Sequence, residues 1–326
     1  MPLRVHMLHQ PDEDALSALR GALKADVRLS FGREVAGDAD YDVLVGGRPE
    51  HAHLTASANL HTFIVPWAGI PPETRALLLE HPHLAVHNLH FPAIPVAEAT
   101  AALLLAAARL VVPADRSLRR GDWTVPYNGG QGVLLYGKTA LILGYGAIGR
   151  HVARICQGLG MRVIATRRRI TQPTREGDVE IHPAGALPDL LPRATALIVC
   201  LPLTPETEGL IGARELARLP AGAILVNVGR GPIVDEAALY AVLKDGRLFA
   251  AALDVWYQYP PDEAARTHTY PSAYPFHELE NVVMSAHRTN AVGEIEHFRM
   301  EELAQVLDAI AEGREAPNRV DVSAGY

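Results

Sequence analysis

Two series of alternating hydrophobic and polar positions run along the 326-residue chain. In the first hundred residues the apolar runs "LRVHML", "YDVLVGG" and "HTFIVPW" have the length and the flanking turn residues of strands. The run "DEDALSALRGALKA" has the pattern of a helix, with acids in its first turn and Lys24 near its end. Strands that alternate with helices predict a parallel α/β sheet.

A second series begins at Thr139. The strand "TALIL" leads into "GYGAIGR" and the helix "AIGRHVARICQGLG", and the later strand-like runs are "RVIAT", "TALIVC", "AILVNV", "FAAALDV" and "NVVMSA". Six strands with interleaved helices predict a doubly wound sheet. Between the two series, "VAEATAALLLAAARLV" is apolar almost all round and predicts a buried helix. The polar, Gly-rich segment 113–132 follows it as a boundary or an arm.

The last amphipathic pattern, "EIEHFRMEELAQVLDAIAEGR", predicts a helix that returns to the first domain and makes that domain discontinuous. We therefore expect an α/β fold with two Rossmann-like domains, each built on a doubly wound parallel sheet. One domain comprises residues 1–98 and 292–326, and the other comprises residues 99–291.

Composition and charge exclude several classes of protein. A hydrophobic fraction of 48% and a charged fraction of 21% are typical of a soluble globular protein, and the net charge of −7 gives no basic field for nucleic acid or an anionic membrane. The longest apolar run is too short to span a bilayer and contains Arg109, and the N-terminus lacks the apolar core of a signal peptide. Cys156 and Cys200 are expected to be buried thiols in a reducing compartment. The sequence thus predicts a cytoplasmic protein.

The segment "LILGYGAIGR" carries the strongest local motif. Gly144, Gly146 and Gly149 form G-x-G-x-x-G directly after a strand and at the start of a helix. The first glycine suits a tight turn, the second lets the backbone approach a pyrophosphate, and the third lets helix pack on strand. Ala147 and Ile148 begin the helix whose N–H groups favour an anion. A purely structural glycine turn is the alternative to dinucleotide binding.

The residues after the next strand bear on which dinucleotide binds. An acid is expected there to bond the ribose 2′-hydroxyl of NAD(H), but Arg167 and Arg168 stand in "RVIATRRRI" instead. Guanidinium groups can bind a 2′-phosphate in a bidentate manner. NADP(H) is therefore favoured, NAD(H) remains possible, and a solvated basic turn is the alternative reading.

Several ordered motifs resemble those of the D-isomer-specific 2-hydroxyacid dehydrogenase family. They are "AVHNLHFPAIPVAEATAALLLAAAR", "RGDW", "LPLTPETEGLIG", "AILVNVGRGPIVDEAAL", "AAALDVW" and "NVVMSAH", and the resemblance covers nearly the whole chain. The resemblance implies that residues 1–98 with 292–326 bind substrate and that residues 99–291 bind the dinucleotide. It also implies an active site in the cleft between the domains, and a homodimer.

The resemblance also implies roles for single residues. Arg230 would bind the carboxylate and polarise the carbonyl of a 2-oxoacid, and His287 would exchange a proton with the carbonyl oxygen. Asp254 would hold the nicotinamide carboxamide. The backbone of Ala68 and Gly69 would meet the substrate carboxylate. Leu201 and Val228 complete the expected cofactor-binding set.

Two positions depart from the family's pattern. Tyr259 in "DVWYQYP" stands where the family has a glutamate that bonds the catalytic histidine. A tyrosine is neutral at pH 7, so it can orient the ring without a carboxylate's effect on the pKa of His287. Arg288 stands where the family has small residues, and either adds a cation to the anion pocket or points to solvent. Asp262 or Glu263 are alternative partners for His287.

These features together predict an NADPH-dependent reductase of a small 2-oxoacid such as glyoxylate or hydroxypyruvate. Its partner is then a small anionic substrate, with no nucleic acid and no membrane. The alternatives are formate- or phosphite-type oxidation without a full proton relay, and a non-catalytic dimer that senses NADP(H). The clustered histidines in "HAH" and "HPHLAVHNLH" lack cysteine or carboxylate ligands at matching spacing, so surface histidines and no metal are expected.

Overall fold

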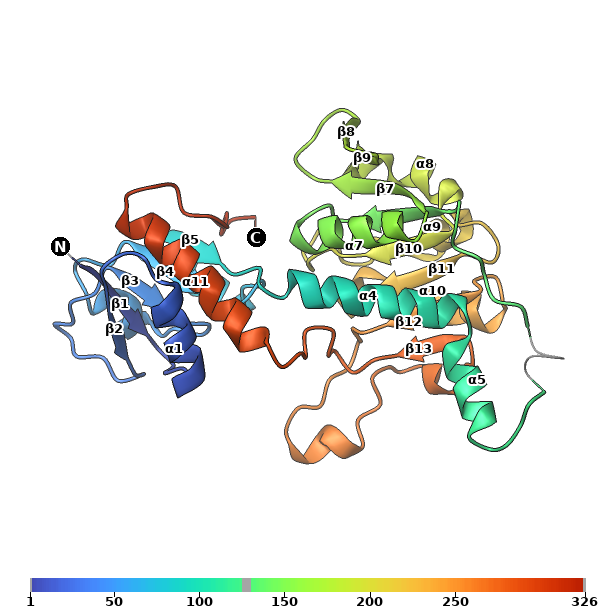
Figure 1. Ribbon diagram of the computed structural model, residues 1–326, viewed down its shortest axis with the longest axis horizontal. Coiled ribbons are helices and arrows are strands. Elements are labelled where there is room, and N and C mark those ends of the chain that lie inside the picture. The colour runs from blue at the N-terminus through green and yellow to red at the C-terminus, as the bar shows by residue number, and fades with distance from the viewer. Residues whose placement is uncertain (1, 125–129, 325–326) are drawn as a thin grey trace. The chain divides into compact units, whose positions relative to one another are not determined.

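The computed structural model describes residues 2–124 and 130–324 (Figure 1). Residues 125–129, within the segment predicted as a boundary or an arm, lie outside the described residues. The chain divides into two compact units, Met1–Pro92 with Ala291–Tyr326, and Ala93–Asn290. The first division lies at Pro92, short of the expected boundary at residue 98, because the helix that begins at Ala93 packs within the second unit.

The first unit is built on a five-stranded parallel sheet in the order β2-β1-β3-β4-β5. Its strands are β1 (Leu3–Met7), β2 (Val27–Phe31), β3 (Val43–Val45), β4 (Thr62–Val65) and β5 (Ala85–Asn88). Helices cover both faces: α1 (Glu13–Ala22) and α11 (Ile295–Ala311) on one, α2 (His51–Thr55) and α3 (Pro72–Leu79) on the other. The runs "VRLSF" and "AVHN" were not among the predicted strands; both are short and carry polar residues.

The C-terminal helix α11 lies against α1, although the two are nearly three hundred residues apart (Figure 1). Leu303 and Leu307 pack into the same core as Leu19 of α1. The buried carboxylate of Asp308 accepts hydrogen bonds from the backbone of Lys24 and Ala25, both at 3.0 Å. The apolar contacts and the buried hydrogen bonds of Asp308 hold the C-terminal helix in the first unit.

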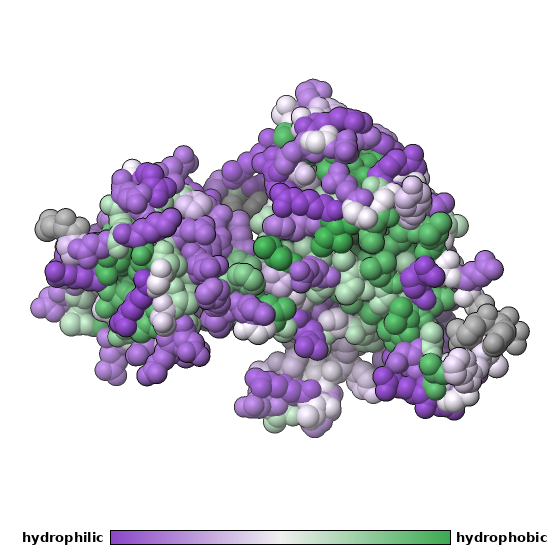
Figure 2. All heavy atoms as spheres, viewed as in Figure 1, coloured by the Kyte–Doolittle hydropathy of each residue, from purple (hydrophilic) through white to green (hydrophobic). Residues whose placement is uncertain are grey.

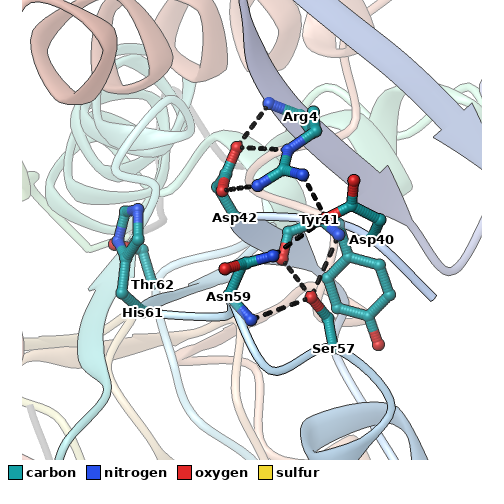
Figure 3. A network of polar contacts seen from close by, with 8 residues as sticks. All are labelled: Arg4, Asp40, Tyr41, Asp42, Ser57, Asn59, His61 and Thr62. Atoms are coloured by element: carbon teal, nitrogen blue, oxygen red, sulfur yellow. Dashed lines mark hydrogen bonds and ion pairs between the residues drawn. The ribbon is translucent and has the colours of Figure 1, made fainter. Parts of the chain in front are cut away.

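Arg4 ties β1 to the segment that precedes β3 (Figure 3). Its backbone N–H and its Nε each donate to Asp42 at 2.9 Å, and its Nη groups pair with Asp42 and Asp40. Asn59 donates to Asp40 at 2.9 Å and extends the network. The Arg4 hydrogen bonds lower the pKa of Asp42 below its usual value, so the carboxylate is charged in the folded protein at neutral pH.

The expectation that the clustered histidines lie on the surface is wrong for His53, His81 and His87, which are buried. The Nδ1 atom of His53 accepts from the Glu50 amide at 2.8 Å, and that of His87 lies 2.7 Å from the Pro317 carbonyl. Imidazole carries both a donor and an acceptor, so it can satisfy backbone groups inside the unit.

The second unit is built on an eight-stranded sheet in the order β13-β12-β11-β10-β6-β7-β9-β8. All neighbours are parallel except β8 and β9 at the edge. The strands are β6 (Thr139–Leu143), β7 (Arg162–Arg167), β8 (Thr174–Glu176), β9 (Val179–Pro183), β10 (Ala196–Val199), β11 (Ile224–Asn227), β12 (Ala250–Leu253) and β13 (Val282–Met284). The six predicted strands are all present, and the prediction missed β8 and β9.

Helices cover both faces of this sheet as well, which confirms the predicted pair of doubly wound folds. One face packs on α4 (Ala93–Ala108) and α7 (Ala147–Gly158). The other packs on α8 (Leu187–Leu190), α9 (Ala213–Arg218) and α10 (Glu236–Lys244). Strands covered on both faces need apolar residues at successive positions, as in the fully buried β6, β10, β11 and β12.

The apolar helix α4 is only partly buried, because Ile94 and Leu105 remain exposed. It is followed by α5 (Val111–Leu118), which begins after Leu110 in the left-handed conformation. Within residues 2–124 and 130–324 no single helix has the length and apolar composition to cross a bilayer; α4 and α5 pass that test only as a pair, bent by 67°.

Candidate dinucleotide and active site

In the sheet of the second unit, the strand order reverses between β6 and β10. The chain runs from β6 outward through β7 and β9 on one side, and from β10 outward through β13 on the other. Parallel α/β sheets bind ligands at the carboxyl ends of the strands at such a reversal. Gly144 follows β6 and Leu201 comes shortly after β10, so the glycine motif lies at this position.

Two of the three glycines, Gly144 and Gly149, meet a steric demand, and Gly146 borders open space. Gly144 has a φ of 96°, which strains any residue with a side chain, and a Cβ there would lie 2.9 Å from the Cys200 carbonyl oxygen. A Cβ at Gly149 would lie 2.0 Å from the Gly144 carbonyl oxygen. A Cβ at Gly146 would meet nothing within 4 Å, which leaves open space at the first residue before α7.

That open space fits the pyrophosphate of a dinucleotide. It faces the N-terminus of α7, where Ala147 and Ile148 begin the helix and their N–H groups have no partner within the helix. Leu201 borders the same turn, with its Cδ2 atom 3.1 Å from the position of a Cβ at Gly144. The fold and the glycine turn define a dinucleotide-binding Rossmann unit.

Basic residues lie where the adenosine ribose would be expected. Arg167 ends β7 and is exposed, as is Arg168. The Tyr145 amide donates to the Thr166 carbonyl at 2.9 Å, which holds the end of β7 beside the glycine turn. The guanidinium of Arg150 lies over the Tyr145 ring, 4.7 Å from its centroid, and pairs with Glu176.

Arg230 lies in a tight turn after β11 that is stabilised by Asn227. The Asn227 side chain accepts from the Gly229 amide and donates to the Arg230 carbonyl, both at 3.0 Å. A Cβ at Gly229 would lie 2.5 Å from the Leu201 carbonyl oxygen, so the turn lies against the segment that follows β10. Val228, with its amide bonded to Val199 at 3.1 Å, continues the strand edge.

Arg230 is exposed, and its turn lies at the carboxyl edge of the sheet. Its Nη1 atom donates to the Gly229 carbonyl at 2.7 Å, which leaves most of its donors available to an anion.

His287 follows β13 in a left-handed conformation, with a φ of 52°. Asp254 follows the neighbouring β12 and is fully buried. Desolvation of the imidazole and the charge of Arg230 lower the pKa of His287, and the Asp254 carboxylate opposes them. The structure therefore brings Arg230, Asp254 and His287 to one edge of one sheet.

Tyr259 faces His287 across a ring contact. The two ring centroids are 5.6 Å apart and the rings are tilted by 56°. The Tyr259 hydroxyl accepts a hydrogen bond from the Trp256 amide at 3.1 Å, so its partner is a backbone group and not the imidazole. The tyrosine is 47% exposed. Its contact with His287 is one of ring packing.

The alternative acidic partners bond to residues of their own loop and not to His287. Asp262 accepts from the Ala265 amide at 2.9 Å at the start of the short helix η4 (Ala264–Thr267), and Glu263 pairs with Arg266 at 3.1 Å. Arg288 is exposed, and its amide donates to Asp254 at 2.9 Å.

The remaining expected substrate residues lie in the first unit. Ala68 and Gly69 form the turn after β4, and the Ala68 carbonyl accepts from the Asn88 side chain at 2.6 Å. Gly69 is exposed. The turn lies at the carboxyl end of its strand, which is the edge where parallel sheets bind ligands.

Two further observations complete the inventory of the site. Across residues 2–124 and 130–324, no group of three or more His, Cys, Asp or Glu side chains has an arrangement that could hold a metal ion. Three residues not predicted from the sequence hold the site together: Asn227, Ser285 and Thr289. Only Asn227 had a local signal, because it precedes the glycine turn of "VNVGRG".

Comparison with known proteins agrees with this geometry. Residues 101–289 match the model of the NAD-binding domain of D-isomer-specific 2-hydroxyacid dehydrogenases. The chain belongs to the D-isomer-specific 2-hydroxyacid dehydrogenase family, which confirms the resemblance seen in the sequence motifs.

Individual relatives extend the comparison. A glyoxylate reductase of Korarchaeum cryptofilum is 40% identical over 227 residues, which are 68% of this chain and 64% of the relative. One of Aeropyrum pernix is 41% identical over 231 residues, 69% of this chain and 65% of the relative. The matched part thus spans less than two thirds of either relative. A family member from Xanthobacter autotrophicus Py2, solved with NADPH and MES, is 26% identical over the full length of both chains with a TM-score of 0.80.

Proposed function

We propose that the protein interconverts a small 2-oxoacid and its D-2-hydroxyacid by hydride transfer, with residues 99–291 binding NADP(H) and residues 1–98 with 292–326 binding substrate. The observation that carries the proposal is the convergence of Arg230 and His287 on the sheet edge that holds the glycine turn. The two similar glyoxylate reductases support a 2-oxoacid as the substrate.

In the proposed chemistry Arg230 acts as a cation and His287 acts as an acid. When bound, the nicotinamide supplies hydride in reduction and accepts it in oxidation. The Arg230 guanidinium binds the substrate carboxylate and polarises the adjacent carbonyl. Protonated His287 gives its proton to the carbonyl oxygen in reduction, and neutral His287 takes the hydroxyl proton in oxidation. The backbone of Ala68 and Gly69 offers N–H donors to the carboxylate.

The charge state of His287 decides the direction that a given pH favours. Its pKa is lowered from the ordinary value near 6.5, so the imidazolium is a minor form at neutral pH. Reduction consumes the imidazolium, and its rate is therefore expected to fall as pH rises through the pKa. Tyr259 adds no negative charge to offset this.

The cofactor preference is proposed from the two arginines after β7. Arg167 and Arg168 are exposed at the position of the ribose-binding acid, and the similar protein from Xanthobacter autotrophicus Py2 was solved with NADPH. We expect NADPH to bind at least tenfold tighter than NADH, a difference of about 1.4 kcal/mol. Fluorescence titration with both cofactors measures it.

A matched set of variants tests this preference. Arg167→Ala and Arg168→Ala should each weaken NADPH and leave NADH within about twofold, whereas Arg169→Ala, an exposed neighbour, serves as the control. Equal affinities for the two cofactors in the wild-type protein would contradict the preference.

The function itself is tested by following NADPH consumption over a panel of 2-oxoacids. Turnover with at least one of them, lost in His287→Gln, supports the proposal. Turnover with formate or phosphite and NADP⁺ alone would favour oxidation without a proton relay. Tight NADPH binding without any turnover would favour a sensor.

A homodimer is also proposed, on the basis of exposed apolar side chains in the second unit. Figure 2 shows hydrophobic residues at the surface over α4. The exposed large apolar side chains on α4, α5 and the segment before β6 include Ile94, Leu105, Val111, Leu118, Leu134 and Tyr136. Exposed apolar groups of this kind mark association surfaces. Light scattering across a range of concentrations measures the mass of the particle.

A further inference from the structure

The loop that carries His287 is held by one buried carboxylate. Asp254 accepts hydrogen bonds from the Ser285 hydroxyl at 2.5 Å, the Arg288 amide at 2.9 Å, the Thr289 amide at 3.2 Å and the Thr289 hydroxyl at 2.8 Å. All four donors come from five consecutive residues with His287 at their centre. The lone pairs of Asp254 are thereby engaged by the loop itself.

This arrangement stabilises a conformation that His287 would not readily adopt by itself. A residue with a side chain is disfavoured at a positive φ, and His287 has a φ of 52°. The two amides that follow it both donate to Asp254, so the carboxylate fixes the backbone directly after the strained residue. The fixed backbone sets the direction of the Cα–Cβ bond of His287 and so limits the positions that its ring can reach.

Thr289 contributes more to this anchor than its neighbours. It is buried, and it supplies two of the four donors, one from its backbone and one from its side chain. Both reach the same oxygen, Oδ2, whereas Ser285 and Arg288 reach Oδ1. Removal of the Thr289 hydroxyl therefore weakens one side of the carboxylate only.

We propose that Thr289 is a positioning residue, which acts through Asp254 to hold the His287 loop in the geometry needed for proton exchange. The proposal rests on the proposed function of His287 as proton donor. Thr289 need not touch substrate or cofactor for this role. The sequence "HRTN" places the hydroxyl group of Thr289 two residues after His287.

The charges around the imidazole give the role a measurable signature. The charged or titratable groups around the imidazole are Arg230 in the turn after β11, Asp254 at the end of β12, the neutral Tyr259, and Arg288 beside the histidine in the loop. Desolvation and Arg230 together outweigh Asp254 and keep the pKa of His287 low. His287 is already exposed to solvent in the structure. A loop released from Asp254 lets the ring move away from Arg230 and lose its remaining desolvation, and the pKa of His287 then rises toward the ordinary value near 6.5.

The test compares Thr289→Val, which keeps the shape and removes the hydroxyl, with Thr289→Ser, which keeps the hydroxyl. At a pH low enough to protonate His287 in both proteins, we expect Thr289→Val to lower kcat for 2-oxoacid reduction about tenfold, with the NADPH Kd within about twofold, as for loss of one hydrogen bond to a charged group. The pKa of His287, followed by NMR of its C2 proton and assigned with His287→Gln, should rise. Thr289→Ser should restore both.

The outcomes separate this role from a merely structural one. If Thr289→Val lowers thermal stability but leaves kcat and the His287 titration unchanged, the proposal is wrong. If Thr289→Val does not fold, Ser285→Ala with Ser285→Thr as its rescue asks the same question from the other carboxylate oxygen. The NMR titration needs no turnover, so an inactive wild-type protein would refute the proposed function while the titration still decides whether Thr289 positions His287.

Discussion

Replacement of Tyr259 by glutamate tests how the site sets the proton affinity of His287. The tyrosine ring packs beside the imidazole with a centroid separation of 5.6 Å, and it carries no charge at neutral pH. Tyr259→Glu would place a carboxylate beside a histidine whose pKa is already lowered by desolvation and by Arg230. A nearby negative charge favours the imidazolium, so the pKa should rise.

The size of this effect follows from the separation and the exposure. At about 5.6 Å two unit charges interact by roughly 3 kcal/mol at an effective dielectric constant of about 20, and by roughly 0.7 kcal/mol at about 80. Because Tyr259 is 47% exposed, the true value lies toward the weaker limit. About 1.4 kcal/mol corresponds to one pH unit, so a shift of about one unit is expected.

The assay is the pH dependence of kcat/KM for 2-oxoacid reduction in the wild-type protein, Tyr259→Glu and Tyr259→Gln. Glutamine has the shape of glutamate without its charge, so it isolates electrostatics from packing. The descending limb should move upward by about one unit in Tyr259→Glu and stay near the wild-type position in Tyr259→Gln. Equal midpoints in both variants would refute the reasoning, as would a wild-type rate that stays flat to about pH 8.

Three further results are expected. Gly149→Ala should abolish dinucleotide binding measured by fluorescence and lower the melting temperature, because its Cβ would lie 2.0 Å from the Gly144 carbonyl oxygen; an unchanged Kd would contradict the packing. Arg230→Ala should remove most turnover and leave the NADPH Kd within about twofold, and an equal loss of both would show that the guanidinium serves the cofactor. Asp42→Asn should cost about 1–2 kcal/mol of unfolding free energy at pH 7 in urea titrations, because Arg4 bonds the charged carboxylate. The pKa of Asp42 is lowered on folding, so this stabilisation is fully present above the unfolded pKa near 4 and is lost as pH falls through the folded pKa; a difference between the two proteins that does not shrink as pH falls below about 4 would contradict it.

The local patterns of the sequence were sufficient for much of the fold and for the glycine turn. Every strand predicted for the second unit is present, and Gly144 and Gly149 meet the steric demands expected of them. The apolar runs and the collision of a Cβ at Gly149 with Gly144 depend on neighbours within about ten residues. Gly144 is required by its own positive φ and also by Cys200, which is distant in the sequence. The motifs also identified the family, because their order along the chain is specific.

Long-range contacts decided what the sequence could not. Histidines that read as surface residues are buried, because His87 finds its partner at Pro317, some 230 residues away. Tyr259, expected to bond His287, instead accepts from the backbone of Trp256.

The contacts of Asp254 show most clearly the difference between what local sequence patterns predict and what long-range contacts decide. From the sequence it was a cofactor contact, but the fold brings it to Ser285 and Thr289, 31 and 35 residues further on. Adjacent parallel strands place their carboxyl ends side by side, whatever the length of the connection between them. The sequence alone determined that strands and a histidine would be present, and only the tertiary structure decided which carboxylate would hold the histidine's loop.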